Sequence, residues 1–192
     1  MKKIIQEKFL ESAKIIQESS ELSESIEKCV NVISTSLKNG KKICLFGNGG
    51  SAADAQHIAA ELIGRYKMER SSIPAISFTT DTSILTSLSN DYSFETIFSR
   101  QCESLVNEKD IVIAISTSGN SKNVINGVIA AKKKNAVVIG FLGNDGGELK
   151  NIVDIPLIVK TKSTGRIQEV HRVIYHIICE LVEKELVERE VK

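Results

Sequence analysis

The sequence predicts an α/β fold in which a doubly wound parallel sheet follows an N-terminal helical extension. Beyond residue 40, short apolar runs alternate with segments of helical periodicity, an order typical of sheets covered by helices. Most of these runs are continuous rather than alternating, as expected for parallel strands that are buried on both faces. Before residue 40, apolar residues recur at helical spacing without an intervening strand. We therefore expect one domain over 1–192, with helices in 1–40 and an α/β core in 41–192.

The order of elements follows from the same patterns and from the turn residues between them. The N-terminal part is predicted to be helical over 3–38 with a break at 19–23, and Asn39-Gly40 is a typical helix C-terminus. The predicted strands are 42–46, 73–78, 110–116, 136–142 and 153–159. The other predicted helices are 52–65, 81–89, 94–106, 121–134 and 166–188, with a turn near Gly146-Gly147. Such folds bind ligands beyond the carboxyl ends of the strands.

Composition narrows the class of protein. Lys and Arg total 25 and Asp and Glu total 24, so no basic field indicates nucleic-acid binding. No apolar run approaches the ~20 residues of a membrane span, and the N-terminus lacks the apolar core of a signal peptide. The four cysteines are scattered, which favours buried, reduced thiols. We expect a cytoplasmic protein that binds neither nucleic acid nor membranes.

The loop after the first predicted strand, Gly47-Asn48-Gly49-Gly50-Ser51, has the composition of an anion-binding turn. Glycines allow a sharp turn with exposed N–H groups, and the following helix directs its positive end to the same place. Ser51 adds a hydroxyl donor. Further along that helix, His57 and Glu61 lie four residues apart and therefore share one face. The combination indicates chemistry on a small phosphorylated molecule.

Two other interpretations of this loop remain open at the level of sequence. A glycine-rich turn also occurs simply where a chain reverses direction. The loop also fits a loose dinucleotide fingerprint, which expects an acidic residue at the end of the next strand. That strand is followed by Thr79-Thr80, and Asp81 comes late, so the nicotinamide interpretation is weak.

A second candidate anion loop follows the strand 110–116. Its sequence is Ser116-Thr117-Ser118-Gly119-Asn120-Ser121, and a helix follows. Hydroxyls and backbone N–H groups at a helix start can surround a phosphate without a charged side chain. A helix cap needs only one such residue. The excess of hydroxyls therefore favours a phosphate site.

Together, the two loops resemble those of the sugar isomerase (SIS) domain, and the whole chain resembles the bacterial phosphoheptose isomerases. The resemblance runs from the first helices to the last one. It includes the segments Gln56-His57-Ile58-Ala59-Ala60-Glu61-Leu62, Gly64-Arg65-Tyr66, Pro74-Ala75-Ile76, Asn90-Asp91, Ile97-Phe98-Ser99-Arg100 and Arg166-Ile167-Gln168-Glu169-Val170-His171. So many segments in the same order make it specific.

The resemblance implies a five-stranded, flavodoxin-like parallel sheet and a homotetramer with active sites at subunit interfaces, the helices in 1–40 taking part in oligomerisation. The residues that would hold the phosphate are Ser116, Thr117, Ser118 and Ser121. Those that would contact the rest of the substrate are Asn48, Gly49, Gly50, Ser51, Glu61, Asn90, Asp91 and Gln168. One zinc ion per subunit would be bound by His57, Glu61, Gln168 and His176, and Glu61 and His176 would form the acid–base pair.

The activity implied is the conversion of sedoheptulose 7-phosphate to D-glycero-D-manno-heptose 7-phosphate, the first step of nucleotide-activated heptose synthesis for lipopolysaccharide or capsule. This isomerisation removes a proton from C1 and returns one at C2 through an enediol. A carboxylate can act as the base, and an imidazole that titrates near neutrality can move protons between the oxygens. A divalent metal would polarise the carbonyl.

The spacing of the ligands on the last helix raises a question. Gln168 and His176 are eight residues apart, which separates them by ~12 Å along an ideal helix. Either the helix begins irregularly, or facing helices from different subunits complete the site. His171, on the same helix, is expected to be structural.

Two other functions fit parts of the sequence. The tetrameric protein that associates with the bacterial replication initiator shares the fold and similar loops, but it lacks the Glu and the His of the catalytic pair. Both are present here, as Glu61 and His176. An isomerase or sensor of another sugar phosphate is the third possibility.

Overall fold

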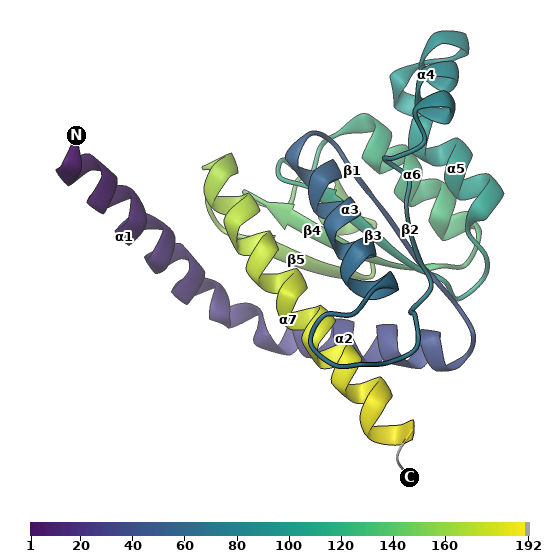
Figure 1. The fold of residues 1–192 in the computed structure, drawn as a ribbon. Helices are drawn as coiled ribbons and strands as arrows, with labels where there is room; N and C mark the ends of the chain where they lie inside the picture. The colour runs from purple at the N-terminus through teal and green to yellow at the C-terminus, as the bar shows by residue number, and fades with distance from the viewer. Residues whose placement is uncertain (191–192) are drawn as a thin grey trace.

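The computed structural model describes residues 1–190, and it contains one five-stranded parallel sheet (Figure 1). The strands are β1 (Ile43–Gly47), β2 (Ala75–Ser77), β3 (Ile111–Ser116), β4 (Val137–Gly143) and β5 (Ile155–Val159). Their order in the sheet is β2-β1-β3-β4-β5, and every neighbouring pair is parallel. The predicted fold class is confirmed. Because β1 and β3 are parallel neighbours, the loops that follow them lie side by side at the carboxyl ends of the strands.

The helices follow the predicted order with shifted ends. They are α1 (Lys2–Glu18), η1 (Ser19–Leu22), α2 (Ser23–Lys38), α3 (Gly50–Ile63), α4 (Thr82–Asp91), η2 (Phe94–Thr96), α5 (Ile97–Leu105), α6 (Lys122–Lys133), η3 (Leu149–Asn151) and α7 (Thr164–Glu190). The predicted break at 19–23 is the 3₁₀ turn η1. The predicted helix 94–106 is divided into η2 and α5.

One predicted strand is much shorter than expected. The apolar run 73–78 forms a strand only at Ala75–Ser77, which pairs with β1 on one side. Pro74, just before it, has no N–H group to donate, and β2 lies at the edge of the sheet, so fewer hydrogen bonds hold it. Ile73 and Phe78 are nevertheless buried, which explains the apolar run.

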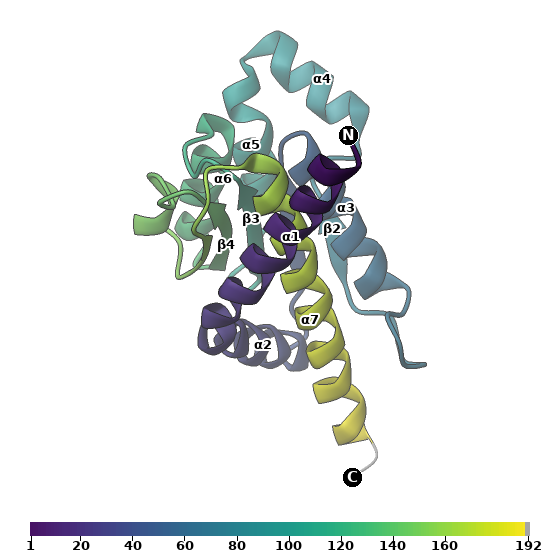
Figure 2. The ribbon, with the colours of Figure 1, turned by 90° about the vertical axis from the view of Figure 1, so that its left-hand side faces the viewer.

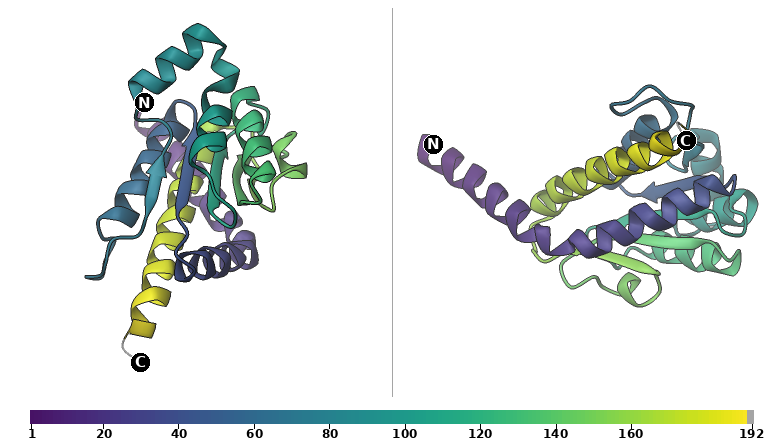
Figure 3. Two further views of the ribbon diagram at one scale, coloured as in Figure 1. Left: turned by 90° about the vertical axis from the view of Figure 1, so that its right-hand side faces the viewer. Right: turned by 90° about the horizontal axis from the view of Figure 1, so that it is seen from below.

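Each face of the sheet has its own hydrophobic core. Ile43, Leu45 and Ile113 point into a core built with α2, α3 and α7. The alternate residues Cys44 and Phe46 point into a second core built with α5 and α6. Side chains alternate across a strand, so the two layers of helices explain why most strand residues are apolar on both faces of the sheet (Figures 1 and 3). The four cysteines are buried and free, as predicted.

The two N-terminal helices differ in their relation to the body of the protein. α2 packs against α7 and contributes buried residues to the first core. α1 projects away from the sheet, and none of its residues, all of which the structure describes, is buried (Figures 1 and 3). It exposes the large apolar side chains Ile4, Ile5, Phe9 and Leu10. No described helix, the long α7 included, combines the length and the apolar character needed to cross a bilayer.

A buried carboxylate holds the loop between α3 and β2. Glu183 on α7 accepts hydrogen bonds of 2.7–3.0 Å from the backbone N–H groups of residues 66–68. Arg70 donates to it at 3.0 Å, and the side chains of the pair are only 3% and 1% exposed. Burial acts to raise the pKa of Glu183, but the three N–H donors and Arg70 outweigh burial and lower that pKa. The loop is therefore fixed to α7 through one side chain.

Replacing Glu183 with Gln should destabilise the protein by about 3 kcal/mol, because the amide cannot accept all of these bonds and Arg70 is left buried without its counter-charge. Glu180→Gln is the matched control, since Glu180 pairs with Lys67 on the surface one turn earlier. We expect that control to cost less than about 1 kcal/mol. Denaturant unfolding measures both free energies, and equal losses would contradict the role given to Glu183.

His171 lies completely buried under the end of β4, which confirms its predicted structural role. Its Nε2 contacts the carbonyl oxygen of Leu142 at 3.0 Å, so the neutral ring donates from Nε2. The other ring nitrogen, Nδ1, has no partner among the described residues. Burial lowers the pKa of His171 from 6.5 to about 4, against smaller opposing effects of the Leu142 carbonyl and of Asp54.

The free energy of unfolding should fall as the pH falls from 6.5 to about 4. In that window the unfolded chain takes up a proton that the folded His171 does not, so acid favours the unfolded state. His171→Gln keeps a donor for Leu142 but does not titrate. Denaturant unfolding across this window should show a loss smaller by at least about 1 kcal/mol in the variant. Parallel pH curves for the two proteins would contradict this assignment.

Candidate active site

The two glycine- and serine-rich loops lie side by side at the carboxyl edge of the sheet. Gly47, at the end of β1, is in register with Ile115 of β3. A reciprocal pair of amide hydrogen bonds joins the loops, since Asn48 and Asn123 each donate to the other at 2.8 and 2.9 Å. Asn123 belongs to the first turn of α6. The sheet and this amide pair together hold two helix N-termini next to each other.

Two glycines of the first loop differ in what the absence of a side chain allows. Gly49 has φ 57°, a left-handed conformation that other residues rarely adopt. At Gly50 a Cβ would collide with the side-chain amide of Gln168 on α7. α3 begins at Gly50 rather than at residue 52, so Ser51 lies in its first turn and is buried. The structure therefore places Gln168 against the start of α3.

The second loop is organised by its own hydroxyl groups. The Oγ atoms of Ser116 and Ser121 are 3.2 Å apart, and Ser116 Oγ also accepts the N–H of Gly119. Ser118 Oγ accepts the N–H of Asn120 at 3.2 Å. A hydroxyl that accepts a hydrogen bond keeps its own O–H as a donor. The loop therefore presents hydroxyl donors at the N-terminus of α6, an arrangement suited to an anion.

An open pocket of about 580 Å³ borders this hydroxyl loop. Ser118 lines one side, and the segment Lys160–Lys162 lines the other. Lys160 also forms an ion pair with Glu21 at 2.8 Å. The two lysines bring positive charge near a loop that itself contains only neutral donors, and Asp145 on the same wall partly offsets that charge.

Two histidines and a glutamate from α3 and α7 form the chemically active cluster. His57 Nε2 lies 2.8 Å from Glu61 Oε1, one turn apart on α3. His176 on α7 faces them, and one ligand atom from each of the three side chains lies within 4.8 Å of the others. The ring centroids of the two histidines are 5.4 Å apart. Within the part of the chain that the structure describes, this is the one cluster of such groups with metal-binding geometry.

Two tyrosines surround this cluster. Tyr66, from the loop that Glu183 holds, stacks on His176 with ring centroids 5.6 Å apart. Tyr175 contacts His57 Nδ1 through its hydroxyl at 3.2 Å. Partial burial lowers the pKa of His176, the charge of His57 adds to that effect, and Glu61 opposes it. His176 is therefore held neutral near pH 7, the form in which an imidazole binds a metal or accepts a proton.

The cluster fits a zinc ion. Zinc in catalytic sites takes three protein ligands, commonly imidazole nitrogens and a carboxylate oxygen, and keeps one position open. The two imidazoles and one carboxylate found here are such a donor set, and their atoms converge. His57 and Glu61 are part-buried, so a small molecule can reach them. A bound cation would also compensate the carboxylate of Glu61.

The structure brings together three of the four predicted metal ligands. Gln168 and His176 both belong to α7, which is continuous from Thr164, so an irregular helix start does not bring them together. The two side chains begin ~12 Å apart along the helix. Asn90 and Asp91 lie exposed at the end of α4, which arches away from the sheet (Figure 2). Their described side-chain hydrogen bond is to each other.

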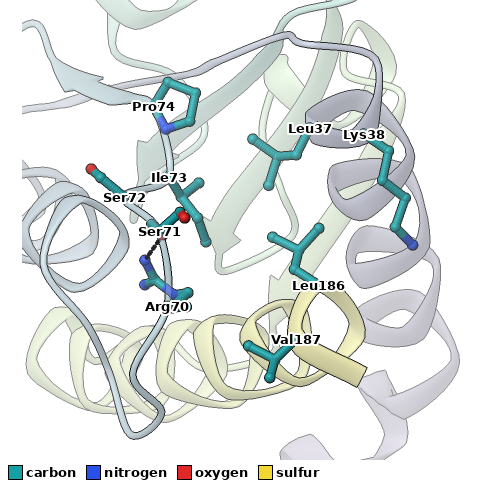
Figure 4. Close-up of a pocket in the computed structure, with 9 residues that line it drawn as sticks. All are labelled: Leu37, Lys38, Arg70, Ser71, Ser72, Ile73, Pro74, Leu186 and Val187. Carbon is teal, nitrogen blue, oxygen red and sulfur yellow. Dashed lines mark hydrogen bonds between the residues drawn. The ribbon is translucent and has the colours of Figure 1, made fainter. Parts of the chain in front are cut away.

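The apolar pocket in Figure 4 is separate from this cluster. Its volume is about 370 Å³, and it lies where the end of α2 meets the segment 70–74 and the end of α7. Leu37, Ile73 and Leu186 supply its apolar walls, and Arg70 donates to the Ser71 carbonyl at its rim. None of the predicted site residues lines it.

Several residues at the site were not singled out by sequence reasoning. Asp54 accepts a hydrogen bond from Arg172 at 3.1 Å, and Tyr175 contacts His57. One signal was available, because Asp54 and His57 on one helix, and Arg172 and Tyr175 on the other, are each three residues apart and so share a face. That the two faces meet is a fact of tertiary structure.

Comparisons with known proteins agree with this picture. Residues 8–143 match the SIS domain family. The chain is 50% identical over 189 residues to the phosphoheptose isomerase of Sulfurimonas denitrificans, covering 97% of both chains. It is 53% identical over 182 residues to that of Aquifex aeolicus, covering 94% of this chain and 95% of the relative. The solved phosphoheptose isomerase GmhA from Neisseria gonorrhoeae superposes with a TM-score of 0.91 at 39% identity, covering 95% of this chain and 98% of that one.

Identity of this size over nearly the whole of each chain confirms the family that the two loops and the ordered segments predicted. The agreement extends to the fold, since the superposition covers almost every residue of both structures. The chain is therefore an isomerase, and it belongs to the phosphoheptose isomerase family of SIS-domain proteins.

Proposed function

We propose that this isomerase converts sedoheptulose 7-phosphate to D-glycero-D-manno-heptose 7-phosphate through an enediol. The observation that carries the proposal is the arrangement along α3, which starts at the first anion loop, beside the second, and bears His57 and Glu61 farther along. Gly50 and His57 are ~10 Å apart along the helix axis. That separation is comparable with the length of an open-chain heptose phosphate. The name of the relatives, phosphoheptose isomerase, supports a heptose phosphate as the substrate class.

The hydroxyl loop is the proposed phosphate site. Ser116, Thr117, Ser118 and Ser121 surround the N-terminus of α6, where backbone N–H groups and the helix dipole favour an anion. The neighbouring segment from Asn48 to Ser51, together with Gln168, would contact the sugar chain. Asn90 and Asp91 lie at the end of α4. Their proposed contacts with the substrate therefore require α4, of this subunit or of another one, to approach the two anion loops.

Glu61 is the proposed base. Its carboxylate lies in the cluster and would take the proton from C1, and the neutral imidazole of His176 would move a proton between the oxygens of the enediol. His57, Glu61 and His176 would hold a zinc ion, and His176 would move the proton in the state in which its accepting nitrogen is not bound to that ion. That ion, when bound, would supply Lewis-acid polarisation of the carbonyl. A carboxylate has two oxygens, so Glu61 can face the ion with one and accept the proton with the other.

A homotetramer with Gln168 supplied across a subunit interface is the proposed assembly. Two observations support it. α7 is regular, which keeps Gln168 away from His176 of its own chain, so Gln168 would be a metal ligand only at the cluster of another chain. α1 exposes Phe9 and Leu10 on a helix without buried residues, a surface that a second copy can cover.

In the cell, the product would enter nucleotide-activated heptose synthesis for lipopolysaccharide or capsule in the cytoplasm. The rival functions fit less well. A non-catalytic partner of the replication initiator has no need of Glu61 and His176 in one cluster with His57. An isomerase of another sugar phosphate would keep the cluster, and substrate assays distinguish it.

Glu61→Gln should reduce turnover of sedoheptulose 7-phosphate at least ~100-fold, because the amide keeps the shape but cannot take a proton. NMR of the zinc-supplemented protein with this ketose phosphate would follow the aldose anomeric signal. Glu69→Gln, on an exposed carboxylate, is the control and should leave the rate unchanged. Full activity in Glu61→Gln would exclude this base, and an inactive wild type would exclude the substrate.

Ser118→Ala should raise KM roughly tenfold and leave kcat nearly unchanged, because one hydroxyl donor to a charged phosphate is lost in ground state and transition state alike. Steady-state kinetics measure the two constants separately. Ser23→Ala removes an exposed hydroxyl that bonds locally to Ser20 and serves as the control. An unchanged KM in Ser118→Ala would place the phosphate elsewhere.

A further inference from the structure

The ring of His57 is held at both of its nitrogens. Nε2 lies 2.8 Å from Glu61 Oε1, and Glu61 is another of the three potential metal ligands. Nδ1, on the opposite side, lies 3.2 Å from the hydroxyl oxygen of Tyr175. The two aromatic rings are 5.4 Å apart and tilted by 58°. The Tyr175 hydroxyl thus contacts one nitrogen of the His57 ring, and Glu61 contacts the other.

Tyr175 is itself held by charged groups on the same two helices. Its side chain is among the largest fully buried ones, so the position of its hydroxyl is set by packing. Arg172, one turn earlier on α7, lies beside the phenol and opposes the rise that burial causes in the pKa of Tyr175. Arg172 Nη2 donates in turn to Asp54 Oδ1 at 3.1 Å. Asp54 is buried on α3, so the guanidinium is anchored.

The hydrogen-bond chemistry of an imidazole gives this contact a direction. A histidine that binds a cation through Nε2 must carry its proton on Nδ1, and the partner at Nδ1 selects that tautomer and orients the ring. The phenol oxygen can accept from Nδ1–H. In the absence of a cation, Nε2–H can donate to Glu61 while Tyr175 donates to Nδ1. A hydroxyl serves both states, whereas an ionised carboxylate only accepts and a lysine ammonium only donates.

We propose that Tyr175 is a positioning residue that holds His57 for metal binding through Nε2, and that Arg172, anchored on Asp54, keeps the Tyr175 hydroxyl in place. The inference rests on the metal role proposed above for His57. It adds a determinant of metal affinity that contacts neither the metal nor the substrate. A purely structural Tyr175 would contribute to stability and leave metal binding unchanged.

The test is the zinc affinity of the purified, metal-free full chain, measured by competition with a chromophoric chelator. Tyr175→Phe keeps the ring and removes the hydroxyl, and it should weaken zinc binding about 10–100-fold. Its activity should recover when zinc is raised, and its KM should match that of the wild type, because the hydroxyl does not reach the substrate. Tyr66→Phe is the matched control, since it removes the same atom from the ring that stacks on His176. We expect unchanged zinc affinity in that control.

A spectroscopic readout tests the hydrogen bond itself. In the Co²⁺-loaded wild type, the Nδ1–H proton of His57 should exchange slowly with water and give a shifted NMR signal. In Tyr175→Phe that signal should broaden through exchange. Arg172→Met should weaken zinc binding less than Tyr175→Phe does, and it should add nothing in the Tyr175→Phe background, because both changes act through one hydroxyl.

The outcomes separate this inference from the proposed function. Zinc binding by the wild type together with equal affinity in Tyr175→Phe would overturn the role of Tyr175 and leave the metal site intact. Equal losses of zinc affinity in Tyr175→Phe and Tyr66→Phe would overturn it as well. The loss would then not depend on which of the two hydroxyls is removed. A wild type that binds no zinc would overturn the metal site and this role together.

Discussion

The packing of α7 against α3 is the contact on which the site depends. The two helices run in the same direction, and the same sequence separation, 118 residues, relates Asp54 to Arg172 and His57 to Tyr175 (Figure 1). Because the two helices are parallel and this separation stays the same along them, polar side chains of α3 and α7 meet at successive turns. At the start of the contact Gln168 meets Gly50, and beyond its end Glu183 holds the loop that follows α3. One helix pair therefore sets the first anion loop, the histidine–glutamate cluster and the loop that bears Tyr66.

The charges along this contact are paired, which a buried polar interface requires. Asp54 faces Arg172, and Glu183 faces Arg70 and three backbone donors. The exception is the cluster itself, where Glu61 is matched only by imidazoles. A part-buried carboxylate with no lysine or arginine side chain of the described residues paired to it lies in an environment that favours a bound cation. The uncompensated charge thus lies where the chemistry is expected.

The fold and the core of the site could be predicted from the sequence, because both depend on local patterns. Continuous apolar runs predicted the strands, and the i, i+4 spacing of His57 and Glu61 placed them on one face. The length of β2 could not be predicted, because burial of Ile73 and Phe78 gives them a strand-like pattern without strand pairing. The spacing of Gln168 and His176 left two alternatives at the level of sequence, an irregular helix start or a second subunit. The regular helix α7 excludes the first of them.

The sequence by itself determined the α/β class, the two loops at the strand ends and the family, since each rests on residue types at short spacing. That His176 joins His57 and Glu61 was implied by the family resemblance and not by any local pattern, and the tertiary structure brings the three together. Only the tertiary structure decided that the Tyr175 hydroxyl contacts His57 Nδ1. The pair His57 and Glu61 lies more than a hundred positions before the pair Tyr175 and His176 in the chain. Their meeting depends on the register of α7 on α3, which is set by the packing of side chains along the whole interface. No local pattern contains that register.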